Sequence, residues 1–197
     1  MNVLGLIAAI AGWGAIHSIL ASLAAKEAAR RGLGPGAMRL YRLGYNIFAV
    51  VSFLPVLWLM AVLPDRGLYH VPPPWSYLML AGQGLAALLL LAGVLQTDTL
   101  SFFGLRQIIE VERPSRLVTG GLYRYVRHPL YTAGLLFLWL TPVSSLNVLT
   151  LDLSLTVYIL IGAWFEERKL LREYGDEYAE YRRRTPMLIP GLRAAKE

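Results

Sequence analysis

Three long apolar runs fill most of the first half of the chain and limit what it can fold into. The runs cover residues 3–25, 45–63 and 76–95. Each is about 20 residues long, which is the length that a helix needs to cross about 30 Å of hydrocarbon. Hydrophobic residues make up 56% of the 197, which is more than a soluble domain of this size buries. The sequence therefore predicts an all-α integral membrane protein.

A fourth apolar region, residues 129–165, is divided by the sequence TPVSSLN. Pro142 within this sequence disfavours one continuous helix. We therefore expect a helical hairpin whose two ends lie on the same membrane face, and this makes five transmembrane segments with the three preceding runs. The first run lacks a basic head and a small-residue cleavage site, so a retained span is favoured over a signal peptide.

The distribution of basic residues predicts the orientation. Of the 19 Lys and Arg residues, only Arg66 falls in a predicted outer loop, and the others lie between the first two runs, before the hairpin or after Phe165. The positive-inside rule places these three groups in the cytoplasm. We expect a prokaryotic inner membrane, with the N-terminus outside and the C-terminus inside. Topology thus accounts for the net charge of +6, and nucleic acid is not expected as a partner.

The segment after the hairpin has the pattern of a cytoplasmic amphipathic helix. It covers residues 166–184, and Gly175 is a weak point within it. Pro186 and Pro190 end the helix. Helical spacing brings one acidic and several apolar or aromatic residues to one face: Glu167, Leu171, Tyr174, Tyr178 and Tyr181.

The whole chain is expected to form a single membrane domain. The chain has no cysteine, which excludes disulfides and thiolate metal sites, and no metal site is predicted. The expected parts are three spans in 1–96, a cytoplasmic connector that carries the cofactor site in 97–128, the hairpin in 129–165, and a cytoplasmic helix and tail in 166–197.

Polar side chains gather where the hairpin begins and ends. If the two arms pack together, they form a site rich in donors and acceptors at the membrane boundary, where ionisable groups suggest a function. Arginine or histidine suits a carboxylate, and glutamate suits an ammonium group, so a zwitterionic amino acid group would fit. The members are Tyr123, Arg127, His128 and Tyr131 from one arm, and Glu166 and Glu167 from the other.

Each of these residues also has an ordinary structural interpretation. Arg127 can be a topogenic charge or a headgroup anchor, and Tyr123 and Tyr131 can belong to an interfacial aromatic belt. Glu166 and Glu167 can be a solvated helix start. The combination is more informative than any single member.

The combination resembles a known superfamily. The sequence LVTGGLYRYVRHPLY, the hairpin and then EERKLLREYGDEYAEYRRRTPMLIP are similar to the C-terminal half of the isoprenylcysteine carboxyl methyltransferase and phospholipid methyltransferase superfamily. The resemblance covers residues 117–190. It implies an integral membrane methyltransferase that uses S-adenosylmethionine without a soluble Rossmann domain, and a glycine-rich nucleotide loop after a strand is absent from the sequence.

Shorter motifs resemble one branch of that superfamily. The sequences GWGAIHSILAS, YRLGYN, FFGLRQI and TPMLIP are similar to NnrU proteins and methanethiol S-methyltransferases. The resemblance implies that the cofactor pocket is formed by Tyr123, Arg127, His128, Pro129, Tyr131, Glu166 and Glu167. Helical phase favours Glu167 over Glu166, because Glu167 shares the face of the buried tyrosines.

The acceptor side is predicted from depth alone. His17, Asp98 and Arg106 are the candidate catalytic residues, because a thiol acceptor needs a base or a stabilised thiolate. Tyr45, Asn46 and Gln107 lie at the same depth and are candidate substrate-binding residues. His17 can equally be a hydrogen-bonded structural residue, and Arg106 can be a topogenic charge. The acceptor is expected to enter from the lipid bilayer.

Several functions stay open at this point. S-methylation of a small or lipophilic thiol is the leading hypothesis, and methylation of an isoprenylcysteine-type carboxylate or a phospholipid amine is the alternative. A non-enzymatic NnrU-like membrane protein or a transporter is the second alternative. A transporter more often has repeated halves and polar breaks near the midplane, whereas the polar residues here gather at the inner boundary. The oligomeric state is not predicted.

Overall fold

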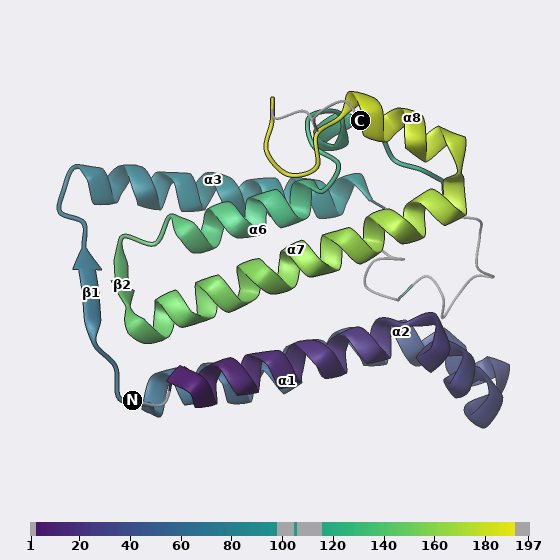
Figure 1. The fold of residues 1–197 in the computed structure, drawn as a ribbon, viewed down its shortest axis with the longest axis horizontal. Helices are drawn as coiled ribbons and strands as arrows, with labels where there is room; N and C mark the ends of the chain where they lie inside the picture. Colours follow the sequence, from purple (N-terminus) through teal and green to yellow (C-terminus); the bar gives the residue numbers. More distant parts are fainter. Residues whose placement is uncertain (1–2, 98–104, 106–115, 192–197) are drawn as a thin grey trace. The chain divides into compact units, whose positions relative to one another are not determined.

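The computed structural model describes residues 3–97, 105 and 116–191, and these residues form helices with one small sheet (Figure 1). The chain divides into two compact units. Within the described residues, the first unit holds 3–68, 105 and 145–155, and the second holds 69–97, 116–144 and 156–191. The elements are α1 (Val3–Ala21), α2 (Leu23–Val62), β1 (Gly67–His70), α3 (Trp75–Gln96), η1 (Gly121–Arg124), α6 (Pro129–Trp139), β2 (Val143–Ser145), α7 (Leu146–Tyr174) and α8 (Asp176–Arg184).

Among the described helices, four are long and apolar enough to cross a membrane: α1, the Met38–Val62 part of α2, α3 and α7. All three apolar runs of the first half therefore form helices as predicted. Both arms of the predicted hairpin are helical, but α6 has 11 residues and is about 16 Å long. The sequence between the arms forms β2, which pairs with β1, and this small sheet was not predicted.

The first unit is built on packing between α1 and α2. Leu6, Ile10 and Val56 form its buried core, with Trp13 and Phe53 packed against it. Helix α2 extends further toward its N-terminus than the apolar run, and it contains a break at Gly34, where φ is +79°. Only glycine adopts this left-handed conformation without strain, so the sequence allows a kink there.

A row of hydrogen bonds follows the contact between α1 and α2. Trp13 Nε1 donates to Ser52 Oγ at 3.1 Å, and His17 Nε2 lies 2.7 Å from Tyr45 Oη. Nearer the end of α1, Tyr41 Oη donates to the Leu20 carbonyl at 2.7 Å. The polar groups of this seam are therefore paired across the two helices, as groups inside a membrane must be.

The start of α7 is held within the first unit by two polar residues. Asp65 accepts a hydrogen bond from the backbone N–H of Asn147 at 3.0 Å, which places a carboxylate at the N-terminus of the helix. The Asn147 side-chain amide donates to the carbonyls of Met60 and Leu63 at 3.3 Å. These bonds connect the beginning of α7 to the end of α2.

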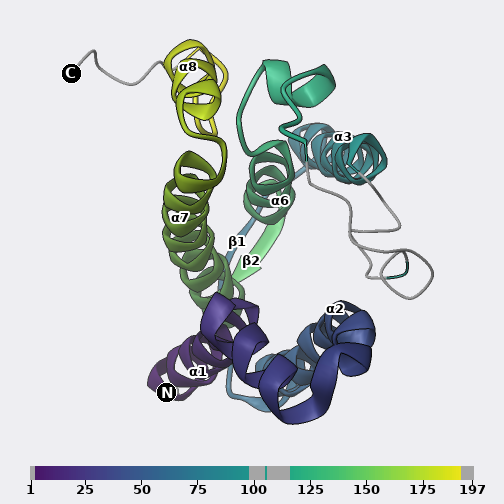
Figure 2. The same ribbon diagram turned by 90° about the vertical axis from the view of Figure 1, so that its right-hand side faces the viewer.

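In the second unit, α6 lies between α3 and α7 (Figures 1 and 2). Helix α3 approaches α6 closely at two glycines. A Cβ atom at Gly82 would lie 2.7 Å from Leu140, and one at Gly93 would lie 2.7 Å from Leu130. The glycines thus leave room for leucine side chains, a common way for membrane helices to pack. Gln83 adds a polar tie, because its amide donates to the Phe137 carbonyl at 2.8 Å.

Helix α8 is separated from α7 by Gly175, where φ is +53°. The predicted weak point therefore ends the helix and turns the chain. Tyr178 and Tyr181 are buried as the amphipathic pattern predicts, but Leu171 is 38% exposed, because the turn at Gly175 separates the two parts of the predicted face. Helix α8 ends at Arg184, before Pro186.

Candidate active site

The site begins where the chain enters α6. His128 precedes the helix and Pro129 occupies its first turn, where proline has no N–H bond to lose. The backbone N–H groups of Arg127 and His128 donate to the carbonyls of Pro186 at 2.9 Å and Met187 at 3.1 Å. The segment 185–188, which we call the C-terminal strap, is therefore bonded to the residues that precede α6.

The Arg127 side chain is buried, and the chain satisfies its donors. Nε and Nη2 both donate to the Glu167 carboxylate at 2.8 Å, as a two-pronged pair. Nη1 donates to the Thr185 carbonyl at 2.5 Å and to the Arg182 carbonyl at 3.2 Å. Arg127 therefore connects α7 to the end of α8 and the strap. Its contacts are those of a residue in a structural ion pair rather than those of a residue that binds a ligand.

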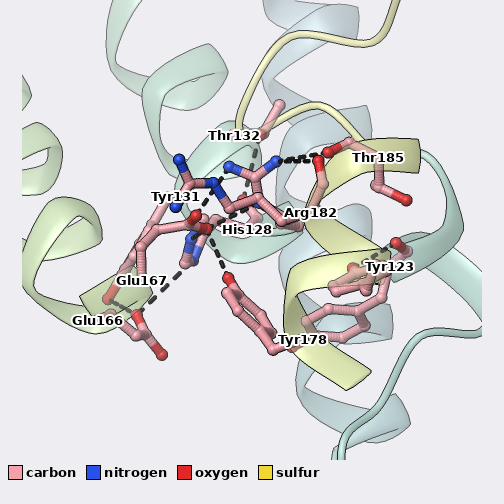
Figure 3. A network of polar contacts seen from close by, with 11 residues as sticks. Tyr123, His128, Tyr131, Thr132, Glu166, Glu167, Tyr178, Arg182 and Thr185 are labelled. Carbon is pink, nitrogen blue, oxygen red and sulfur yellow. Dashed lines mark hydrogen bonds and ion pairs between the residues drawn. The ribbon is translucent and has the colours of Figure 1, made fainter. Parts of the chain in front are cut away.

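Glu167 is the centre of this network (Figure 3). In addition to Arg127, its Oε1 accepts from His128 Nε2 at 2.8 Å and from the Tyr178 hydroxyl at 2.6 Å. Burial and then the hydrogen bond to Glu167 raise the pKa of Tyr178, so this phenol stays a donor at physiological pH. Since a carboxylate only accepts, the bond to His128 requires the hydrogen on Nε2.

Glu166 lies at the open side of the same network. Its side chain is 43% exposed, compared with 11% for Glu167. Tyr131 Oη donates to Oε2 at 2.8 Å, and His128 Nδ1 lies 3.7 Å from the same oxygen. The rings of His128 and Tyr131 are stacked at 5.3 Å. In the described part of the chain, no hydrogen bond or ion pair reaches Oε1 of Glu166.

Tyr123 belongs to the same site through η1. The carbonyl of Tyr123 accepts from the Tyr181 hydroxyl at 2.6 Å. Burial and then the charge of Glu166 raise the pKa of the Tyr123 phenol. The turn before it is held by Gln96, whose side chain accepts from Leu122 N at 2.8 Å. Gly121 has φ of +58° in this turn, a left-handed conformation that favours glycine.

The six polar residues that sequence reasoning placed at the ends of the hairpin are therefore brought together. Glu167 and Tyr178 are joined by a hydrogen bond, but they lie on two helices separated at Gly175 rather than on one continuous helical face. The residues predicted for the acceptor side do not belong to this cluster. His17 and Tyr45 form a pair in the first unit, and Asn46 is half-buried in the same unit. Asp98, Arg106 and Gln107 lie outside the described residues.

Sequence reasoning missed the strap carbonyls and one buried acid. The motif TPMLIP marked the strap, but no residue type signals which backbone carbonyls accept hydrogen bonds. Asp152 in α7 is 6% exposed. A lone acid inside an apolar run could have drawn attention to it, because ionisable residues in membrane spans default to a functional hypothesis. Among the described residues, no group of three or more metal-ligating side chains is found.

The fold and the site define a helical integral membrane protein with a charged hydrogen-bond network between the start of α6 and the C-terminal part of α7. The chain belongs to the phospholipid methyltransferase family, whose pattern matches residues 77–177. This match covers α3 to the start of α8, and so includes every residue of the network up to Glu167.

Named relatives agree with this membership. A methanethiol S-methyltransferase of Mycobacterium tuberculosis is 31% identical over 180 residues, which cover 88% of this chain and 72% of the relative. Methanethiol S-methyltransferase 2 of Bradyrhizobium diazoefficiens is 33% identical over 163 residues, or 77% of this chain and 60% of the relative. The human protein-S-isoprenylcysteine O-methyltransferase is 32% identical over 83 residues, which cover 41% of this chain and 29% of the relative.

The chain spans about half the length of several curated relatives that it matches, from 42% to 60% in three of them. No solved structure matches the chain.

Proposed function

We propose that the protein is an S-adenosylmethionine-dependent methyltransferase that transfers a methyl group to a small or lipophilic thiol. The observation that carries this proposal is Glu166, a half-exposed carboxylate fixed at the edge of a network whose other charges are satisfied. Membership of the phospholipid methyltransferase family supports methyl transfer. The names of the relatives from Mycobacterium and Bradyrhizobium support a thiol, with methanethiol as the first one to test.

The residues at the open side of the network fit this cofactor by their chemistry. S-adenosylmethionine, when bound, supplies a methyl group on a positively charged sulfonium. Its amino acid part carries an ammonium group and its ribose carries hydroxyls, and both are donors. Glu166 Oε1 is an acceptor without a protein partner in the described residues, and Tyr131 keeps the carboxylate in place. Glu166 is therefore the proposed contact for the ammonium or a ribose hydroxyl.

The other site residues have positioning roles in this proposal. Glu167 holds His128 and Arg127, and its own acceptors are used by the chain. His128 stacks on Tyr131 and presents its Nδ1 edge toward Glu166. Tyr123 adds a phenol whose pKa is raised, so it offers a hydrogen bond and no charge. A rigid set of this kind suits a reaction that depends on alignment and water exclusion.

For a thiol acceptor, we propose His17, in the first unit, as the candidate base for the thiol proton, with its ring oriented by Tyr45. His17 Nε2 lies 2.7 Å from Tyr45 Oη, and the ring stacks on Trp13 at 5.0 Å. A neutral imidazole held in this way can act as a general base.

The proposed topology has five membrane segments, with α6 as a short fifth segment. The N-terminus lies outside the cell, and α8 and the site lie in the cytoplasm, where the cofactor is made available. The basic residues that follow α7 support this orientation through the positive-inside rule.

A methyl-transfer assay tests the proposal. Purified protein would receive a labelled methyl donor with methanethiol, a prenylcysteine or phosphatidylethanolamine as acceptor. We expect label in the thioether of methanethiol and little in the other two. Label in the prenylcysteine ester or the phospholipid would replace the thiol assignment, and no label in any acceptor, together with no binding of the cofactor, would contradict methyl transfer. His17→Gln should abolish turnover while binding of S-adenosylhomocysteine remains.

A further inference from the structure

The C-terminal part of α7 has an outward surface that the proposed reaction does not use. It is formed by Trp164, Phe165, Arg168, Lys169 and Arg172, which we call the α7 outer face. Trp164 is 51% exposed and Phe165 is 60% exposed, and the three basic residues are exposed as well. The opposite side of the helix in this region faces the protein interior: Ala163 is fully buried and Glu167 is 11% exposed.

The position along α7 places this face at the boundary of the membrane. Helix α7 begins at Leu146, and about 20 residues from there cross about 30 Å of hydrocarbon. Trp164 and Phe165 therefore fall where aromatic residues are enriched at membrane interfaces. Arg168 and Lys169 lie roughly 5 Å further along the axis, at the level of the lipid headgroups.

The three cations of this face have no carboxylate of their own. Among the described residues, Arg168, Lys169 and Arg172 make no ion pair with a carboxylate. The guanidinium of Arg168 lies 4.7 Å from the centre of the Trp164 ring, and Arg172 Nε donates to the Arg168 carbonyl at 3.2 Å. Arg168 is thus directed back toward the aromatic residues, with its charge still available to an anion.

A second basic cluster in the same unit provides a contrast. Arg183 and Arg184, at the end of α8, both form ion pairs with Glu180. The aromatic residues of that helix, Tyr178 and Tyr181, are buried rather than exposed, and the charge of the two arginines is partly neutralised by this acid. The α7 outer face combines unneutralised charge with exposed aromatic rings, whereas the arginines of the α8 cluster pair with an acid and the rings of that helix are buried.

We propose that the α7 outer face binds the headgroup of an anionic phospholipid. The phosphate lies on Arg168 and Lys169, and the acyl chains lie along Trp164 and Phe165. The adjoining rings favour a lipid over a free phosphate, since they supply an apolar surface for the chains. The three unneutralised cations favour an anionic headgroup, because each basic residue near a membrane surface attracts anionic lipid. This site is independent of methyl transfer.

Quenching of Trp164 by brominated lipids tests the proposal. The full chain would be reconstituted in phosphatidylcholine bilayers that contain a small fraction of brominated phosphatidylglycerol or brominated phosphatidylcholine. The signal of Trp164 is the difference between wild type and Trp164→Phe. We expect phosphatidylglycerol to quench this signal with a preference of roughly tenfold over its bulk fraction. Equal quenching by the two lipids in the wild type would overturn the proposal.

Matched double variants separate a local site from the overall field of the protein. Arg168→Gln with Lys169→Gln should reduce the preference to within about twofold of unity. Arg183→Gln with Arg184→Gln removes the same charge from the α8 cluster and should leave the preference unchanged. An unchanged preference in the α7 variant, or an equal loss in both variants, would contradict a headgroup site on α7. Circular dichroism would verify that both variants keep their helices.

Discussion

The hydrogen bonds between α1 and α2 and the network around Glu167 both satisfy polar side chains between helices, but they do so with different kinds of partner. Both bring polar side chains together between apolar helices. In the seam, neutral groups pair one to one, as His17 with Tyr45 and Trp13 with Ser52. In the network, one carboxylate accepts four hydrogen bonds from three side chains.

This difference predicts how much stability each region loses when one of its polar residues is substituted. The loss of one member from a neutral pair between membrane helices costs little on average, because the same polar groups also find partners in the unfolded reference state. A charged network that loses its central carboxylate leaves a buried guanidinium without its counter-ion. We therefore expect the two regions to respond to similar substitutions with different magnitudes, and the following predictions test this.

The largest effect is expected for Glu167→Ala. The substitution removes the acceptor of Arg127 and His128 and leaves a buried charge unpaired, so we expect a loss of about 3–5 kcal/mol in stability. Thermal unfolding in detergent would measure it. Glu180→Ala is the control, since this exposed acid pairs with arginines on the surface of α8. A Glu167→Ala protein that unfolds at the wild-type temperature would contradict the central role of this carboxylate.

A smaller effect is expected for Tyr178→Phe. The phenol donates one of the four bonds to Glu167 and is buried to 1% exposure. Its loss should cost about 1.5–3 kcal/mol, since the partner is charged. The same measurement of thermal unfolding applies, and a loss as large as that of Glu167→Ala would mean that Tyr178, rather than the ion pair, dominates the network.

The matched change in the seam, Tyr45→Phe, is expected to cost less. It also removes a single phenol, but its partner His17 is a neutral ring between two membrane helices, and such bonds contribute about 0.6 kcal/mol on average. Comparison of the two Tyr→Phe variants in one detergent is the most direct test of the contrast. Equal losses would show that charge makes no difference to the network.

The elements of the fold that depend on local features of the sequence were predictable. Apolar runs of membrane-spanning length predict helices, and the interruption at Pro142 predicted two arms. The approach of His128 to Glu167 followed from the hairpin. The contact between Glu167 and Tyr178 did not follow from helical phase, because the turn at Gly175 ends α7 between them.

The remaining features depend on contacts that sequence spacing does not encode. The different roles of Glu166 and Glu167 depend on which carboxylate the buried Arg127 reaches. The strap is held by backbone carbonyls, which every residue has, so TPMLIP signals it only by resemblance. The pairing of β1 with β2 joins two segments that are too short to have a strand pattern.

The smallest effect is expected for Asp65, at the start of α7. Desolvation alone would raise the pKa of Asp65, but hydrogen bonds from the Ser145 hydroxyl and backbone N–H groups hold it below its ordinary value. A lowered pKa contributes stability above the ordinary range of aspartate, and this is lost as pH falls through the lower value in the folded protein. Because Asp65 is largely exposed, we expect roughly 0.5 kcal/mol.

Thermal unfolding at pH 6 and at pH 3 would measure this contribution. Wild type should lose slightly more stability between the two values than Asp65→Asn, whose side chain does not titrate. An equal loss in both proteins would show that the capping charge does not contribute.

Binding of S-adenosylhomocysteine to the purified protein in detergent tests the central claim most directly. The proposed contact is Oε1 of Glu166, which has no partner among the described residues. Calorimetry should therefore detect saturable binding to the wild type and binding at least about tenfold weaker to Glu166→Gln, the loss expected for a charge-assisted hydrogen bond. Glu180→Gln should bind as the wild type does. No binding by the wild type, or equal binding by Glu166→Gln, would contradict the assignment of this carboxylate to the cofactor.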